Sequence, residues 1–184
     1  MTALFDEICA GAERESRLWA ESLLPADERE LALVFSPLVP DPAQALGLET
    51  IYEGYLLHYG RSRLFASTDA DIALLLGDTL LAHGLVRITD LGEVRAVGDL
   101  AELLSLCAQL RADGRDGDGI AWAASAAYLG RGGLEAARRA LREGGDASKL
   151  AAAARARGGD AAVSAALSAH AALVAPPVGV DHVE

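Results

Sequence analysis

The chain has 184 residues and a formal net charge of −11 at pH 7. This acidic balance argues against nucleic-acid binding, which needs a clustered basic face, and against binding to anionic membrane surfaces. A chain of this length can bury roughly 70% of its unfolded surface, so it needs neither disulfides nor a structural metal to form a core.

The two cysteines, Cys9 and Cys107, lie far apart within apolar helical patterns. We predict that both are buried free thiols, because a free cysteine behaves as a small hydrophobic residue. No Cys/His spacing typical of a zinc site occurs, and we predict neither a metal nor a cofactor. The N-terminus lacks the basic region of a signal peptide, and we find no apolar run approaching the ~20 residues of a membrane span. These features predict a cytoplasmic protein without an integral membrane segment.

Helical periodicity runs through most of the chain, whereas the alternation typical of strands is nearly absent. We therefore predict an all-α fold, a bundle of roughly seven to nine helices. The first helix is predicted over 4–24, where Pro25 ends it. A short helix over 27–35 and a proline-rich turn follow. Asp41 and Pro42 then suit the N-cap and first position of a helix that runs to residue 59.

The most apolar helix is predicted to begin at Thr68 and to end near Ile88. Asp71 stands three residues after Thr68, a spacing that resembles a capping box. Because apolar residues occur on all sides of this helix, we predict that other helices surround it. Asp78 near its centre would then be a buried acid. Thr89 is predicted to cap the next helix, which extends to residue 111 and which Gly98 could kink or divide.

The segment 113–119 is rich in glycine and aspartate, and we predict a flexible linker there. We prefer the linker to a calcium loop of the EF-hand type, because the later ligand positions of such a loop hold non-ligand residues here. Beyond the linker, short helices are predicted over 119–129, 133–143, 147–157 and 160–174. The prediction is thus a single all-α domain over 1–174, with a possible break near 113–119, and an extended tail over 175–184.

Part of the region 46–111 resembles the trans-isoprenyl diphosphate synthases. The run Leu75-Leu76-Gly77-Asp78-Thr79-Leu80-Leu81 is similar to the LAGDxL run in the central helix of that family. The segment 55–61 stands where the family has its LIHDDxxD run, and 99–109 resembles the helix that follows. The resemblance implies an isoprenoid-synthase-like helical core.

The departures from the family concern its metal-binding aspartates, which hold the magnesium ions and the allylic diphosphate. Tyr59 and Gly60 stand in their place, and neither supplies the carboxylate oxygens that magnesium prefers. No second DDxxD run follows. The chain is therefore most similar to the small non-catalytic subunit of heptaprenyl diphosphate synthases. That resemblance implies an accessory subunit, with no catalytic residues, that pairs with a catalytic prenyl diphosphate synthase chain through an apolar face on the 69–111 helices.

Two alternatives remain open. The chain could be a self-contained helical interaction module, a homodimer with no isoprenoid role. It could also be an enzyme that binds a prenyl substrate with rearranged metal ligands.

Four residues are candidates for ligand binding, namely Asp78, His58, Arg61 and Arg63. Asp78 either orients a ligand or pairs with a neighbouring helix. His58 is either a general base or a core or interface histidine. Arg61 and Arg63 follow the position of the family's aspartates, and a guanidinium matches phosphate oxygens, so they could hold a diphosphate. The alternative for both arginines is a solvated connector.

Overall fold

The computed structural model describes residues 2–66 and 69–174, which contain nine α-helices, two short 3-10 helices and no strand. The all-α prediction is confirmed, while the isoprenoid-synthase-like core stays a prediction. The predicted tail over 175–184 lies outside the described residues. The α-helices are α1 (Thr2–Glu15), α2 (Arg17–Glu21), α3 (Ala45–Tyr59), α4 (Ala70–Asp90), α5 (Val94–Ala112), α6 (Asp118–Ala127), α7 (Glu135–Gly144), α8 (Ser148–Gly158) and α9 (Asp160–Leu173). The 3-10 helices are η1 (Ser36–Leu38) and η2 (Pro42–Gln44).

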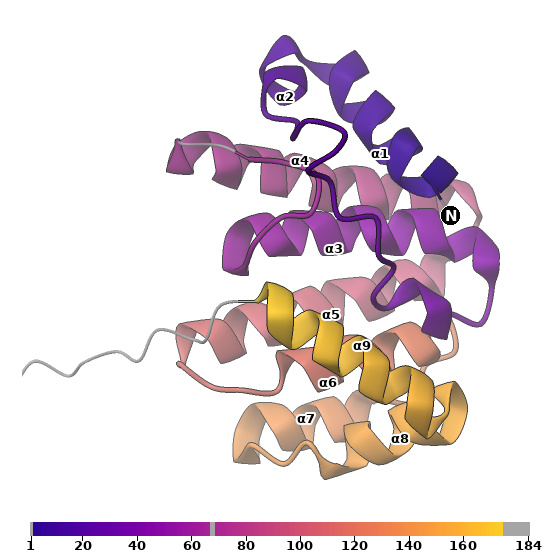
Figure 1. Ribbon diagram of the computed structural model, residues 1–184. Helices are drawn as coiled ribbons and strands as arrows, with labels where there is room; N and C mark the ends of the chain where they lie inside the picture. The colour runs from indigo at the N-terminus through magenta and orange to yellow at the C-terminus, as the bar shows by residue number, and fades with distance from the viewer. Residues whose placement is uncertain (1, 67–68, 175–184) are drawn as a thin grey trace, which may run out of the picture.

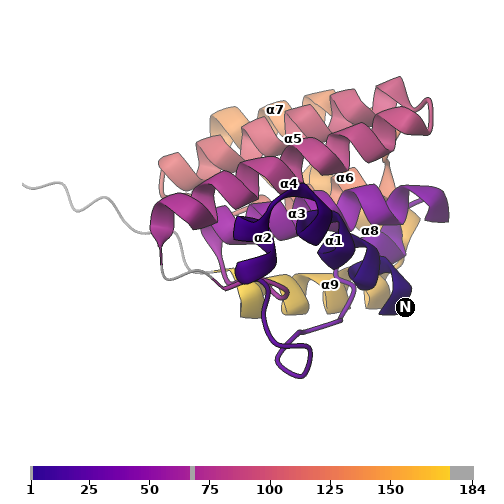
Figure 2. The same cartoon turned by 90° about the horizontal axis from the view of Figure 1, so that it is seen from above.

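The helices lie in layers (Figure 1). At one end, α1 and α2 cover α3 and α4, and at the other end α7 and α8 close the stack, with α5, α6 and α9 between. Figure 2 shows α1 and α2 lying over α3 and α4 when the molecule is seen from above. This order places α4 next to the outer layer of the stack.

The N-terminal prediction was only partly right. The first predicted helix is interrupted at Ser16, whose hydroxyl accepts a hydrogen bond from Leu18 N at 3.0 Å and caps α2. The predicted helix over 27–35 is absent, because the backbone of this stretch bonds to distant residues instead of to itself. Glu30 N donates to Arg63 O, Arg63 Nη1 donates to Ala32 O, and Val34 N donates to a carboxylate oxygen of Glu49. Asp41 does cap the next turn, accepting from Ala43 N at 2.9 Å.

The ends of α4 differ from the predicted ones. The predicted first residue, Thr68, lies outside the described residues, and Asp69 caps the helix by accepting from the backbone N–H groups of Asp71 and Ile72. Thr89 does not cap the next helix. It belongs to α4, and its hydroxyl donates to Leu85 O at 2.8 Å. Gly92, at φ 78°, makes the turn into α5, which Gly98 does not divide.

Glycines bring α3 and α4 into direct backbone contact. A Cβ at Gly84 would lie 2.7 Å from Gly47 O, and a Cβ at Gly54 would lie 2.7 Å from Gly77 O. Gly47 thus lies opposite Gly84 and Gly54 opposite Gly77, which shows that the two helices are antiparallel. Since small residues alone allow helix backbones to approach this closely, the four glycines determine how α4 sits on α3.

The outer side of α4 is open, so the prediction that other helices surround it was wrong. Leu74, Leu75 and Val86 are 51%, 56% and 56% exposed. Asp78, predicted to be a buried acid, has a side chain that is 65% exposed. Two more large apolar residues follow in the α4–α5 turn and at the start of α5. We call this set the α4 face: Leu74, Leu75, Val86, Leu91 and Val94.

Helix α4 bears on the prediction that the chain has no integral membrane segment. By length and composition alone it could cross a membrane, with a mean hydropathy of 1.5 over an 18-residue window that is 28% buried. The core helix of a soluble protein can meet the same two criteria. The absence of an integral membrane segment therefore stays a prediction.

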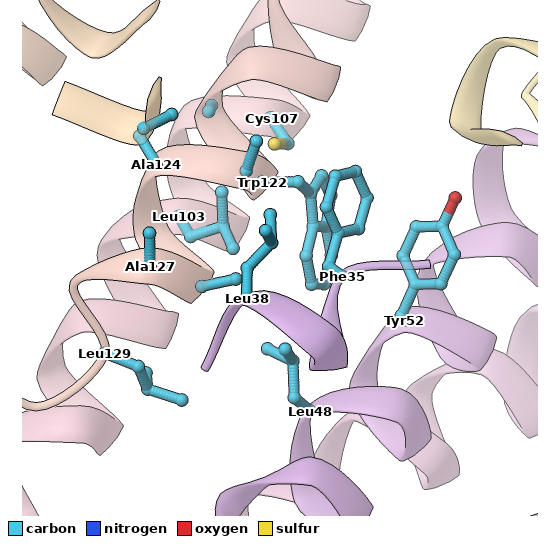
Figure 3. Packing of buried hydrophobic residues seen from close by; sticks show 14 of the residues in the cluster. Phe35, Leu38, Leu48, Tyr52, Leu103, Cys107, Trp122, Ala124, Ala127 and Leu129 are labelled. Atoms are coloured by element: carbon cyan, nitrogen blue, oxygen red, sulfur yellow. The ribbon is translucent and has the colours of Figure 1, made fainter. Parts of the chain in front are cut away.

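The main apolar core surrounds Trp122 of α6 and contains residues that precede the 113–119 segment in the sequence as well as residues that follow it. Trp122 and Phe35 stack with ring centroids 5.6 Å apart, and Cys107 of α5 lies beside them (Figure 3). A second cluster joins α1 and α2 to the inner side of α4 through Leu76 and Leu80. Cys9 and Cys107 are both buried free thiols, which confirms the prediction for the cysteines.

Candidate functional site

A cavity of about 170 Å³ lies between α3, α4 and α5. It contains two of the four predicted site residues, His58 and Asp78. The other lining residues come from all three helices: Tyr55, Tyr59, Leu81, Leu104 and Ala108. Its volume is close to that of an engineered cavity of ~150 Å³ that binds benzene. The cavity therefore suits a small ligand or a single side chain.

His58 and Asp78 face each other at this cavity. His58 Nε2 lies 3.1 Å from Asp78 Oδ1, an ion-pair distance when the imidazole is protonated, and the buried Nε2 atom makes no hydrogen bond to the described residues. The glycine before Asp78 makes the approach possible, since a Cβ at Gly77 would lie 2.8 Å from His58 Nε2. Both residues of the Gly77-Asp78 pair therefore contact His58. The glycine leaves space for the imidazole ring, and the aspartate carboxylate lies next to it.

Two tyrosines form the aromatic side of the cavity. The rings of Tyr55 and Tyr59 have centroids 4.9 Å apart, and the Arg111 guanidinium lies 6.0 Å from the Tyr59 ring centroid. Burial raises the pKa of both phenols. Both therefore stay protonated at neutral pH and act there as neutral rings.

The Tyr55 hydroxyl connects the cavity to a buried ion pair. It donates to Asp118 Oδ2 at 2.5 Å, and Arg111 Nε donates to the same oxygen at 3.0 Å. His170 Nε2 lies 3.3 Å from Asp118 Oδ2. Asp118, predicted to belong to a flexible linker, is instead the buried first residue of α6. Burial opposes the charged form of Asp118, but the contacts with His170, Tyr55 and Arg111 outweigh it and hold its pKa well below the ordinary range.

This depressed pKa predicts a loss of stability in acid. A carboxyl group whose pKa is lower in the folded state stabilises that state above its unfolded pKa of about 3.9, and the stabilisation is lost as the pH falls below that value. Between about pH 5 and pH 3 we expect the free energy of unfolding to fall less for Asp118→Asn than for the wild type, as measured by urea denaturation. The exposed Asp116→Asn is the control. Equal losses in the wild type and Asp118→Asn would contradict the expectation.

The two predicted arginines have structural partners. Arg61 is exposed, and both of its terminal nitrogens donate to the Glu30 carboxylate. Arg63 is 1% exposed, and its side-chain nitrogens donate to Glu53 at 3.0 Å, to Glu49 at 2.8 Å and to a backbone carbonyl. Every nitrogen of the Arg63 guanidinium is thus occupied. The interpretation of Arg63 as a diphosphate ligand is replaced by a core ion pair.

The sequence did not single out Tyr55, Tyr59, Leu104 and Ala108 as site residues. The sequence did contain a signal for these residues. The two tyrosines of α3 are four residues apart, as are Leu104 and Ala108 of α5, so each pair shares one face of its helix. That spacing identifies a face but does not indicate which faces of α3 and α5 meet across a cavity.

Comparisons with known proteins give no match to any family model, curated protein or solved structure. Among residues 2–66 and 69–174, no three acidic, histidine or cysteine side chains lie together where they could hold a metal ion. The described cavity thus combines a carboxylate, an imidazole and two phenols within apolar walls.

Proposed function

We propose that the chain is a non-catalytic accessory subunit that binds a catalytic prenyl diphosphate synthase chain through the α4 face. The observation that carries this proposal is the exposure of Leu75 and Val86 on a helix whose opposite side is fixed to α3 by glycines. Single exposed leucines are ordinary. The α4 face has five exposed large apolar side chains on α4, in the α4–α5 turn and at the start of α5, and exposed apolar surface of this kind is typical of an interaction surface.

Asp78 adds specificity to this surface. Its exposed carboxylate stands between Leu75 and Val86 in the sequence of α4. A charge within an apolar interface adds little to the affinity, but it disfavours partners that cannot pair with it and so fixes the register of docking. We therefore expect a partner surface that is apolar and carries a basic group or a hydrogen-bond donor opposite Asp78.

The isoprenoid part of the proposal is supported by the resemblance of the 75–81 run to the synthase family. Its non-catalytic part is supported by Tyr59 and Gly60, which replace the magnesium-binding aspartates. The partners of Arg61 and Arg63 point the same way, because both arginines are engaged by carboxylates of this chain.

The proposal is tested by co-expression with a DDxxD-bearing synthase chain from the same genome. The wild-type chain is expected to co-purify with the synthase and to change the length of its polyprenyl product. Leu75→Asp/Val86→Asp should lose co-purification, because truncating buried interface anchors costs about 2 kcal/mol or more each. Leu18→Asp changes a leucine that is 39% exposed on α2 and should leave co-purification intact. Failure of the wild type to bind or to alter the product would refute the proposal.

A homodimer with no isoprenoid role is the second candidate. It is favoured by the same exposed face, since two copies of Leu74, Leu75 and Val86 could cover each other across a two-fold axis. Light scattering on the purified chain separates the two candidates. A dimer that Leu75→Asp/Val86→Asp converts to a monomer would favour the homodimer.

A further inference from the structure

The lining of the cavity between α3, α4 and α5 favours a cationic ligand over an anionic one. Among the described residues, Asp78 is the single carboxylate in the lining, and no arginine or lysine of that part of the chain lines it. The nearby Arg111 guanidinium lies 6.0 Å from the Tyr59 ring centroid and donates hydrogen bonds to Asp118 and Tyr55. A phosphate or carboxylate in this cavity would face the Asp78 carboxylate without a lining cation to offset the repulsion.

The polar atoms of the cavity call for a donor. A carboxylate only accepts hydrogen bonds, and a neutral imidazole with its proton on Nδ1 accepts at Nε2. Asp78 Oδ1 and His58 Nε2 are 3.1 Å apart, and the buried Nε2 atom makes no hydrogen bond to the described residues. An ammonium group has three donors and no acceptor, so it can donate to the accessible Asp78 carboxylate.

The apolar part of the lining suits the rest of such a ligand. Leu81, Leu104 and Ala108 contribute alkyl groups from α4 and α5, and Tyr55 and Tyr59 contribute ring faces from α3. Ring faces attract cations through their quadrupole, and more strongly in a partly desolvated site. The volume of about 170 Å³ accommodates a body of roughly the size of benzene.

We propose that this cavity binds a small organic cation, a primary ammonium carried on an aromatic or apolar body. The ammonium donates to Asp78, while its body packs on Tyr55, Tyr59 and the alkyl groups. This site goes beyond the proposed accessory role. It requires no partner chain, and it takes a ligand of opposite charge to a diphosphate.

Benzylammonium is a suitable probe, with benzyl alcohol as its neutral counterpart and benzoate as its anionic one. Ligand-observed NMR or calorimetry on the full chain should show saturable binding of benzylammonium. Benzyl alcohol should bind about tenfold or more weakly, and benzoate should not bind, because only the cation pairs with a carboxylate. Asp78→Asn should weaken benzylammonium about tenfold and leave benzyl alcohol within about twofold. Asp90→Asn, at the end of the same helix, is the matched control.

A second variant locates the ligand. Ala108 lines the cavity from an exposed position of α5, so Ala108→Phe should fill the cavity without disturbing the core. We expect it to abolish binding of both benzylammonium and benzyl alcohol while the helical circular dichroism stays unchanged. Equal affinity for amine and alcohol, full binding by Asp78→Asn or Ala108→Phe, or no saturable binding at all would each overturn the proposal. These measurements use the chain alone, so they are independent of the co-purification test.

Discussion

Arg63→Met is expected to destabilise the protein by about 3–5 kcal/mol, a large part of the ~5–15 kcal/mol that stabilises a typical domain. Arg63 is the cation between Glu49 and Glu53, and both carboxylates are at most 1% exposed. Burial disfavours the charged guanidinium, but these two carboxylates keep the pKa of Arg63 above its ordinary value. Removing Arg63 leaves two buried carboxylates without their counter-charge, which is the costly way to break a buried pair.

The effect should extend to the chain connections that this ion cluster holds. Glu53 also accepts hydrogen bonds from the backbone N–H groups of Arg63 and Leu64, and Glu49 accepts from Val34 N and Ser36 N. Both connectors that flank α3 are therefore fixed to it through these carboxylates. We expect urea denaturation of Arg63→Met to show a lower midpoint, and proteolysis to cut first within residues 24–35.

Arg61→Gln is the matched control for this prediction. Arg61 is two residues away and also pairs with a glutamate, but its side chain is 58% exposed and that of Glu30 is 49% exposed. Exposed pairs contribute about 0–1 kcal/mol, so Arg61→Gln should change stability little. Adding Glu49→Gln to Arg63→Met should recover part of the loss, because it removes one of the unpaired charges. Similar costs for Arg61→Gln and Arg63→Met would contradict the assignment.

Gly84→Ala is expected to destabilise the protein by about 1–3 kcal/mol, even though alanine has the higher helix propensity by ~1 kcal/mol. A Cβ at Gly84 would lie 2.3 Å from Ile51 Cγ1, 2.7 Å from Gly47 O and 2.9 Å from Ile51 N. Two of these three atoms belong to the backbone of α3 and cannot rotate away. The substitution must therefore move α4 as a whole away from α3.

Gly98→Ala is the control, because Gly98 lies within α5 and a Cβ there would meet nothing within 4 Å. This substitution should stabilise the protein by about 0.5–1 kcal/mol. Thermal unfolding followed by circular dichroism can compare the two glycine variants directly. A gain in stability for both would show that α3 and α4 do not touch through their backbones.

The sequence predicted most helices after residue 90 well, because glycines separate short helical segments there. It failed over 27–35, where an apolar pattern typical of a helix is instead irregular backbone that bonds to Glu49 and Arg63. Local periodicity carries no information about such distant partners.

The environment of α4 was misjudged for a different reason. Leucines on all sides suggested that helices surround α4, but its inner side contacts α3 through Gly77 and Gly84, which a hydropathy pattern counts as neutral. The helix thus makes its closest contact through glycine backbone and leaves some of its leucines outside. Asp78 is exposed for the same reason.

The candidate site could be predicted only in part. His58 and Asp78 were identified from the synthase-like runs, and the structure brings them to one cavity. Arg63 belonged to the same predicted site, but a sequence does not distinguish an arginine on a connector from one buried between two glutamates. Leu104 and Ala108 come from α5, and only the packing of α5 beside α4 makes them part of the cavity.

The uncovered α4 face also bears on how the chain behaves in solution. Exposed apolar surface such as the α4 face promotes association when two molecules collide. The net charge of −11 makes such collisions less frequent, because the molecules repel each other. That repulsion reaches only ~8 Å at physiological ionic strength. The unpartnered chain should therefore stay dispersed in dilute buffer and precipitate sooner as salt is added. In a cell, the lifetime of the chain before aggregation or degradation would depend on how quickly another surface covers the α4 face.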